Sequence, residues 1–168
     1  MDLLIVSGRR PDLLENTLTS IKDNIEVDFS NVLINIDPWA GDEKDHQMTK
    51  DVVLKYYPIA VINEPREPNF CQAVKFLWSN VKSNSAFHTE DDWIWNQKFT
   101  EDYFVNGLKQ VGMFRFVTKE NHGYDRYGTS PCVITKEFAH AASKTLNITK
   151  DPEKQVGSNV ELSTLVET

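Results

Sequence analysis

Strand-like and helix-like segments alternate along the first half of the chain, and this order constrains the fold more than any other feature. Apolar runs predict strands at residues 3–7, 31–37, 59–63 and 86–89. Between them, apolar residues recur at helical spacing, which predicts helices near residues 11–25, 43–57 and 73–81. Strands that alternate with helices imply a mainly parallel central sheet with right-handed crossovers. The expected fold class is therefore α/β.

The second half of the chain is less regular. Its pattern predicts helices near residues 103–111 and 138–146 and strands near 113–118 and 132–135. We find no internal repeat and no linker of the kind that separates domains. A chain of 168 residues also fits the usual size of one domain. We expect a single domain over residues 1–168.

Composition and charge narrow the class of protein. A hydrophobic content of 40% with 26% charged residues is ordinary for a soluble globular protein. A net charge of −7 opposes a strong nucleic-acid footprint. No run is long enough for a membrane span, and the amino-terminal run is too short for a signal peptide, so we expect a cytoplasmic protein. Cys71 and Cys132 form no metal-binding spacing and are predicted to be free thiols in the core.

Three consecutive carboxylates, Glu90, Asp91 and Asp92, follow the last strand predicted in the first half. Bringing these charges together on a half-buried segment is costly unless a cation or hydrogen-bond donors compensate. A hard divalent cation takes oxygen ligands and can bridge the phosphates of a nucleotide at the same time. A solvated acidic turn is the alternative. The flanking aromatic residues Phe87 and Trp93 favour a binding site over a free surface loop.

Polar segments follow the other predicted strands as well. Ser7, Gly8, Arg9 and Arg10 follow the first strand, and Asp37 ends the second. In open α/β sheets ligands bind outside the carboxyl ends of the strands, so these segments and the acidic run should converge on one rim. Arginine offers forked donors to a phosphate, although a solvated turn explains the arginine pair equally well. A role as a turn residue before Pro38 is likewise an alternative explanation for Asp37.

The order of these motifs resembles that of a known family. Residues 4–21 (LIVSGRRPDLLENTLTSI) resemble the opening strand, turn and helix of GT-A-fold nucleotide-sugar glycosyltransferases. Residues 34–37 are similar to the second strand of that family, and residues 90–93 resemble its DxD motif with glutamate in the first position. Residues 130–131 and 151–155 resemble an acceptor-side element of smaller members. The chain thus looks like a small family-2-like member, and the fold implied is a GT-A-like (Rossmann-like) domain.

The resemblance implies a nucleoside-diphosphate sugar donor with Mn²⁺ or Mg²⁺. It implies that residues 1–95 bind the nucleotide sugar and that residues 96–168 form the acceptor side. The metal would be held directly by Asp92, with Glu90 contacting the ribose or reaching the metal through water. The nucleotide pocket would be completed by Ser7, Arg9, Arg10, Asp37 and Asp91, of which Asp37 accepts a hydrogen bond from the base.

Transfer with inversion also needs a general base for the acceptor hydroxyl. The candidates are Asp151 and Glu153, with Glu153 favoured by its place after Pro152. Helix capping by Asp151, with Pro152 at the first helical position, is an alternative that can hold at the same time. His122, in a polar loop at residues 119–129, is a candidate for a further metal or diphosphate contact.

Two other functions remain open from the sequence. A nucleotidyltransferase of similar architecture usually carries a Gly-rich loop for a triphosphate, and the turn at residues 7–10 has one glycine and is too short for that. A non-catalytic module that binds a nucleotide sugar or a metal is the other. The acceptor of a transferase would be a glycan, a lipid, a protein or a modified base.

Overall fold

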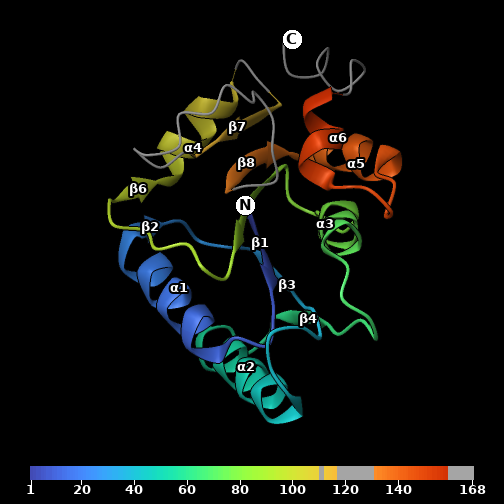
Figure 1. The fold of residues 1–168 in the computed structure, drawn as a ribbon. Coiled ribbons are helices and arrows are strands. Elements are labelled where there is room, and N and C mark those ends of the chain that lie inside the picture. Colours follow the sequence, from blue (N-terminus) through green and yellow to red (C-terminus); the bar gives the residue numbers. More distant parts are fainter. Residues whose placement is uncertain (110–111, 117–130, 159–168) are drawn as a thin grey trace.

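The computed structural model describes residues 1–109, 112–116 and 131–158, which form a sheet with helices on both sides (Figure 1). The strands are β1 (Asp2–Ser7), β2 (Ile25–Glu26), β3 (Asn31–Ile36), β4 (Val61–Asn63), β5 (Ser85–Glu90), β6 (Phe99–Thr100), β7 (Met113–Arg115) and β8 (Cys132–Thr135). The helices are α1 (Pro11–Asn24), α2 (Glu43–Tyr56), α3 (Phe70–Ser79), α4 (Glu101–Leu108), α5 (Lys136–Thr145) and α6 (Pro152–Ser158).

The central sheet is mixed but mainly parallel. Its six strands lie in the order β4-β3-β1-β5-β8-β7, and β4, β3, β1 and β5 run parallel. Strand β8 pairs antiparallel with both β5 and β7. The predicted α/β class is confirmed, and the second half of the chain joins the same sheet as the first. The functional division at residue 95 stays a prediction.

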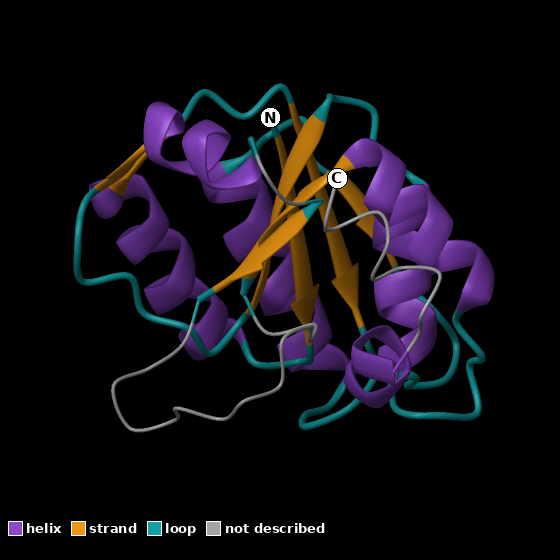
Figure 2. Ribbon diagram, turned by 90° about the horizontal axis from the view of Figure 1, so that it is seen from above, coloured by secondary structure: helices purple, strands orange, loops and turns teal. Residues whose placement is uncertain are grey.

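Helices cover both faces of this sheet (Figure 2). In Figure 1 α1, α2 and α4 lie on one side, and α3, α5 and α6 lie on the other. Strand β1 serves both cores, because Leu3 and Ile5 pack toward α1 while Leu4 and Val6 pack toward α3. All of β1 is buried, which explains why it reads as a continuous apolar run instead of an alternating one.

The helix boundaries follow the capping residues. Helix α2 begins after Asp42, which accepts hydrogen bonds from the backbone N–H groups of Lys44 and Asp45. Helix α3 begins at Phe70, earlier than predicted, because the side chain of Asn69 caps it. These caps lie on the loops that follow β3 and β4, so they also help to fix the edge of the sheet formed by the carboxyl ends of these strands.

The apolar face predicted for α2 was partly wrong. The spacing of Met48, Val52 and Tyr56 in the sequence predicts that they share the apolar face of this helix, but Met48 is 41% exposed. Thr49 and Val53 are buried instead. A threonine can occupy the buried side because its hydroxyl donates to the carbonyl of Asp45 within the same helix.

Cys71 and Cys132 are free and buried, as predicted. Within the described ranges, no helix combines the length and the apolar character that crossing a bilayer requires. The cytoplasmic location expected from the sequence stays a prediction.

Candidate active site

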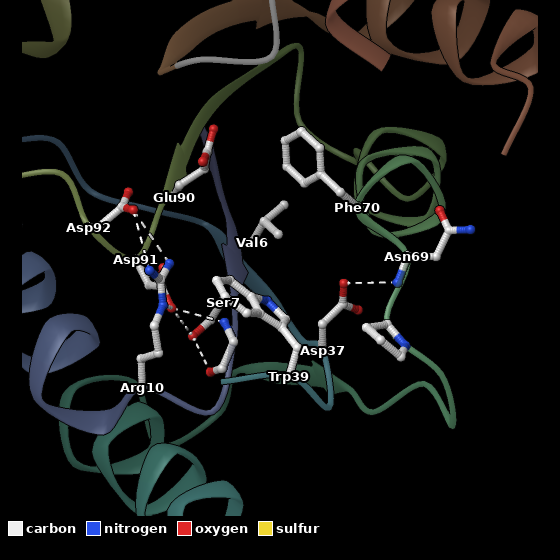
Figure 3. A pocket seen from close by; sticks show the side chains of 12 residues that line it. Val6, Ser7, Arg10, Asp37, Trp39, Asn69, Phe70, Glu90, Asp91 and Asp92 are labelled. Atoms are coloured by element: carbon white, nitrogen blue, oxygen red, sulfur yellow. Dashed lines mark hydrogen bonds and ion pairs between the residues drawn. The ribbon is translucent and has the colours of Figure 1, made fainter. Parts of the chain in front are cut away.

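Four loops that follow parallel strands meet around one pocket, which we call the strand-end pocket (Figure 3). Its volume is about 380 Å³. It is lined by Val6, Ser7, Gly8, Arg10, Asp37, Trp39, Pro68, Asn69, Phe70, Glu90, Asp91 and Asp92. These residues follow or end β1, β3, β4 and β5, so the convergence predicted from strand order is confirmed.

Asp91 is the member of the acidic run that has a structural role. It is fully buried, and its Oδ2 accepts from Ser7 Oγ at 2.8 Å and from the backbone N–H of Gly8 at 2.9 Å. Its Oδ1 pairs with the guanidinium of Arg10. Burial raises the pKa of Asp91 above its ordinary value, although these three partners oppose the shift. Asp91 thereby ties the end of β5 to the turn that follows β1.

Glu90 and Asp92 flank this tether and face the pocket. The side chain of Asp92 is 43% exposed, and its Oδ2 lies 3.4 Å from Arg10 Nη2. Burial, followed by the charges of Asp92, Glu153 and Asp91, raises the pKa of Glu90 to about 7. Among the described residues that line the pocket, Glu90 and Asp92 thus lie beside the guanidinium of Arg10, which is an arrangement that a cation would stabilise.

The two predicted arginines separate in the structure. Arg10 lines the pocket, where it pairs with Asp91 and Asp92 and lies over the ring of Trp39. Arg9 instead pairs with Glu43 on α2, at 2.5 Å, and is not among the residues that line the pocket. A nucleotide contact for Arg9 stays a prediction.

Asp37 lies at the end of β3 and is 3% exposed. Its Oδ1 accepts from Asn35 Nδ2 at 2.8 Å and its Oδ2 from the backbone N–H of Asn69 at 3.1 Å. Asn63 on β4 in turn donates to Asn35 Oδ1 at 2.6 Å. Burial raises the pKa of Asp37, and the Asn35 and Asn69 donors counteract that shift. The sequence also points to Asn63, because it begins the polar segment at residues 63–69 that follows its strand, but the role of Asn35 was missed, although a polar amide within an otherwise apolar strand was a visible signal.

Trp39 was also missed. It lines the pocket and is 46% exposed. Its backbone is held by a 2.8 Å bond from its N–H to the carbonyl of Asp37 and a 2.9 Å bond from Arg9 N to its own carbonyl. A side chain at Gly8 would place its Cβ 2.9 Å from the indole Nε1, so the glycine admits the ring. A large aromatic residue in a polar loop just after a strand was the available sequence signal.

Asp151 and Glu153 border a second hollow, which we call the side groove. Its volume is about 450 Å³, and it shares residues 68–70 with the strand-end pocket. Asp151 Oδ1 accepts from the backbone N–H of Glu153 at 2.9 Å, so the capping role is present. Glu153 is half-buried, and its charge contributes to the raised pKa of Glu90. Glu153 is thus electrostatically coupled to the strand-end pocket.

His88 and Trp95, which lie on either side of the acidic run in the sequence, are both buried in the core. His88 is fully buried, and its Nδ1 accepts a 3.3 Å hydrogen bond from the indole N–H of Trp78. This contact fits packing in the core. Trp95 is buried and Trp93 is half-buried, so at least one of this pair packs in the core. His122 lies outside the described residues.

A divalent cation fits the donor set at the end of β5. Within residues 1–109, 112–116 and 131–158, no group of three or more His, Cys, Asp or Glu side chains is arranged to hold a metal. Glu90 and Asp92 nevertheless offer two carboxylates that repel each other at the pocket. Mg²⁺ is commonly held by one or two carboxylates together with substrate phosphates and water, so two protein ligands suffice when a diphosphate supplies the rest.

Comparison with known proteins gives structural but not sequence matches. No family model and no curated protein matches the chain. A mannosyltransferase from Pyrobaculum calidifontis, solved with GDP-Man and Mn²⁺, superposes with a TM-score of 0.60 over 83% of this chain and 46% of its own, at 13% identity. Residues 1–349 of S. aureus TarS give 0.56 over 87% and 50%, at 8% identity. Glucosyl-3-phosphoglycerate synthase from Mycobacterium tuberculosis, solved with Mn²⁺, UDP and glucosyl-3-phosphoglycerate, gives 0.54 over 82% and 57%, at 11% identity.

The chain has the GT-A-like fold of these proteins. The expected fold is therefore shown, while identities of 8–13% extend the likeness no further than the fold. The chain spans about half the length of the solved structures that it matches. In this GT-A-like sheet the strand-end pocket occupies the edge formed by the carboxyl ends of β1, β3 and β5.

Proposed function

We propose that this chain is a divalent-cation-dependent glycosyltransferase domain that moves a sugar from a nucleoside-diphosphate sugar to a hydroxyl acceptor. The observation that carries the proposal is the strand-end pocket, which joins Glu90 and Asp92 to Arg10 on a GT-A-like sheet. Two solved structures of the same fold contain Mn²⁺ with GDP-Man or with UDP. Their ligands support a nucleotide-sugar donor for this chain.

The pocket residues take different parts of the donor. Asp92 and Glu90 would hold the cation, and Arg10 would donate to the phosphate oxygens. Asp37 accepts from the base, because its buried carboxylate is already oriented by Asn35. A bound divalent cation supplies Lewis-acid stabilisation of the charge that develops on the leaving diphosphate.

The side groove is the proposed entry for the acceptor. For an inverting transfer, the acceptor oxygen attacks the anomeric carbon while the bond from that carbon to the diphosphate oxygen breaks. The electron pair stays on the diphosphate, and Glu153 takes the proton of the acceptor hydroxyl. Glu153 is preferred over Asp151 because Asp151 already caps α6. General-base catalysis of this kind contributes about 10²–10⁴-fold.

A donor panel tests the proposal. UDP-, GDP-, ADP- and CMP-sugars are measured by thermal shift and donor hydrolysis in Mn²⁺, Mg²⁺ or EDTA. We expect a stabilising shift that needs both one nucleotide and the metal, and that disappears in Asp92→Asn. Asp102→Asn, an exposed aspartate on α4 outside the pocket, is the matched control and should respond like the wild type.

The outcomes separate the candidate functions. Nucleotide binding with no hydrolysis or transfer in any condition would indicate a non-catalytic binding domain. Formation of a nucleotide sugar from a sugar phosphate and a nucleoside triphosphate would indicate a nucleotidyltransferase. The absence of any nucleotide response would contradict the proposal altogether.

A further inference from the structure

We infer that Trp39 is the stacking platform for the base of the donor nucleotide and sets the affinity of the pocket for that base. This inference rests on the proposed function, since it concerns the same pocket. It goes beyond that function by assigning the recognition of the base face to one aromatic side chain.

The backbone that carries the indole is locked. The carbonyl of Trp39 accepts from the backbone N–H of Arg9 at 2.9 Å, which joins the loop after β3 to the turn after β1. The next residue, Ala40, adopts a left-handed conformation with φ of 59°. A Cβ at Gly41 would lie 2.6 Å from the carbonyl oxygen of Arg9, so the two turns pack at backbone contact. A left-handed non-glycine residue is held only where its surroundings determine it, so the backbone beside Trp39 has a preset conformation.

The indole is contacted by Arg10 over one face and by the turn at Gly8, and the side chain stays half-exposed. The Cζ atom of Arg10 lies 4.7 Å from the ring centroid, within the range of a cation–π contact. The pyrrole part of the ring lies against Gly8, where a Cβ would come within 2.9 Å of Nε1. Trp39 nevertheless remains 46% exposed while lining the pocket. A half-exposed aromatic ring inside a polar pocket fits a flat ligand group.

The order of side chains across the pocket matches the order of groups in a nucleoside diphosphate. Figure 3 shows Asp37, Trp39, Arg10 and Asp92 in succession across the pocket. The carboxylate of Asp37 suits the hydrogen-bonding edge of a base, and the indole suits its face. Arg10 and Asp92 then suit the phosphates and their cation. The base therefore falls on the ring when the diphosphate reaches the acidic run.

Calorimetric titration measures the contribution of the ring. UDP, GDP, ADP, CDP and inorganic pyrophosphate are titrated in Mn²⁺ into the wild type, Trp39→Ala, Trp39→Leu and Trp39→Phe. Stacking on an aromatic side chain predicts roughly 5- to 100-fold weaker binding of the preferred nucleotide by Trp39→Ala and Trp39→Leu. Trp39→Phe should retain most of the affinity. Pyrophosphate, which has no base, should bind all four proteins within about twofold.

Two controls accompany the titration. Tyr103→Ala removes an aromatic side chain of similar exposure, 54%, that does not line the pocket, and should bind like the wild type. Nucleotide should also quench indole fluorescence in the wild type but not in Trp39→Phe. Trp39→Leu keeps an apolar side chain of substantial volume, so it decides the matter if Trp39→Ala does not fold.

The two proposals fail in different ways. If the wild type binds a nucleotide and Trp39→Leu binds it equally well, the stacking role is overturned while the proposed function stands. Equal weakening of nucleotide and pyrophosphate would show that Trp39 acts only by positioning Arg10, which also overturns stacking. If the wild type binds neither nucleotide nor pyrophosphate, the proposed function fails and the inference fails with it.

Discussion

At the scale of single residues, neighbouring carboxylates in the acidic run lie in opposite surroundings. Asp91 is fully buried and receives hydrogen bonds from Ser7, Gly8 and Arg10, whereas the side chain of Asp92 is 43% exposed. Removing a buried charge leaves its partners unpaired, while removing an exposed charge changes little. One position therefore serves the fold, and the next is available to a ligand.

Denaturation of two single variants tests this division. Asp91→Asn should lower the free energy of unfolding by about 1–3 kcal/mol, because the amide replaces one acceptor oxygen with an NH₂ group that cannot accept from Ser7, Gly8 or Arg10. Asp92→Asn should leave it unchanged within about 0.5 kcal/mol. Urea titration followed by circular dichroism measures both. Similar losses in the two variants would contradict the assignment of Asp91 as the structural member of the run.

Glu90 makes the stability of the protein depend on pH. Burial and the neighbouring charges raise its pKa from 4.5 to about 7, so the folded state binds more protons than the unfolded state between these values. Stability should therefore fall as the pH rises through this window. At pH 8 the free energy of unfolding of Glu90→Gln should exceed that of the wild type by about 1–3 kcal/mol. At pH 4 the two proteins should have nearly the same free energy of unfolding, measured in both cases by urea titration. An equal difference in stability between the two proteins at both pH values would show that it does not arise from the titration of Glu90.

At the scale of elements, the pocket depends on how two turns fit together. The turn after β1 and the loop after β3 are joined by the N–H of Asp37 donating to the carbonyl of Ser7 at 2.8 Å. They also meet where Gly8 admits the indole of Trp39. Neither turn would hold its geometry without the other, because each supplies the space or the hydrogen-bond partner that the other needs.

A double-mutant cycle measures this fit. Gly8→Ala should destabilise the protein by about 1–3 kcal/mol, since its Cβ would approach the indole to 2.9 Å. In a Trp39→Ala background the same change should cost less than about 0.5 kcal/mol, because the obstructing ring is absent. Additive costs in the double variant would show that the glycine is needed for another reason.

The elements that could be predicted from sequence are those with a strong local pattern. Strands β1 and β3 appear as apolar runs because both of their faces are covered by helices. The exposure of Met48 could not be predicted, since the phase of α2 is set by its packing and a threonine replaces an apolar residue in the buried stripe. The position of Trp39 depends on its contacts with Gly8 and Arg9. Both residues are far from Trp39 in the sequence and lie beside it only in the folded chain.

At the scale of the whole molecule, two cores hold one sheet whose carboxyl edge remains open. The cores pack against opposite faces, so the strands can present polar residues at their ends without a gap in the interior. The sequence predicts a site at the acidic run because three adjacent carboxylates beside aromatic residues need compensation, and in the structure the run lines the strand-end pocket. The sequence does not show which of these carboxylates has a structural role, because that depends on the hydrogen-bond partners of each one in the folded chain.

The proposed function depends on a cation shared by the acidic run and a diphosphate. Linkage requires that a nucleotide strengthen Mn²⁺ binding by the same factor by which Mn²⁺ strengthens nucleotide binding. The direct measurement is the Mn²⁺ dissociation constant, from electron paramagnetic resonance of free Mn²⁺, with and without each nucleoside diphosphate. We predict weak binding of Mn²⁺ alone, binding at least about tenfold tighter with the preferred nucleotide, and loss of that gain in Asp92→Asn. The same Mn²⁺ affinity with and without every nucleotide would contradict the proposed function.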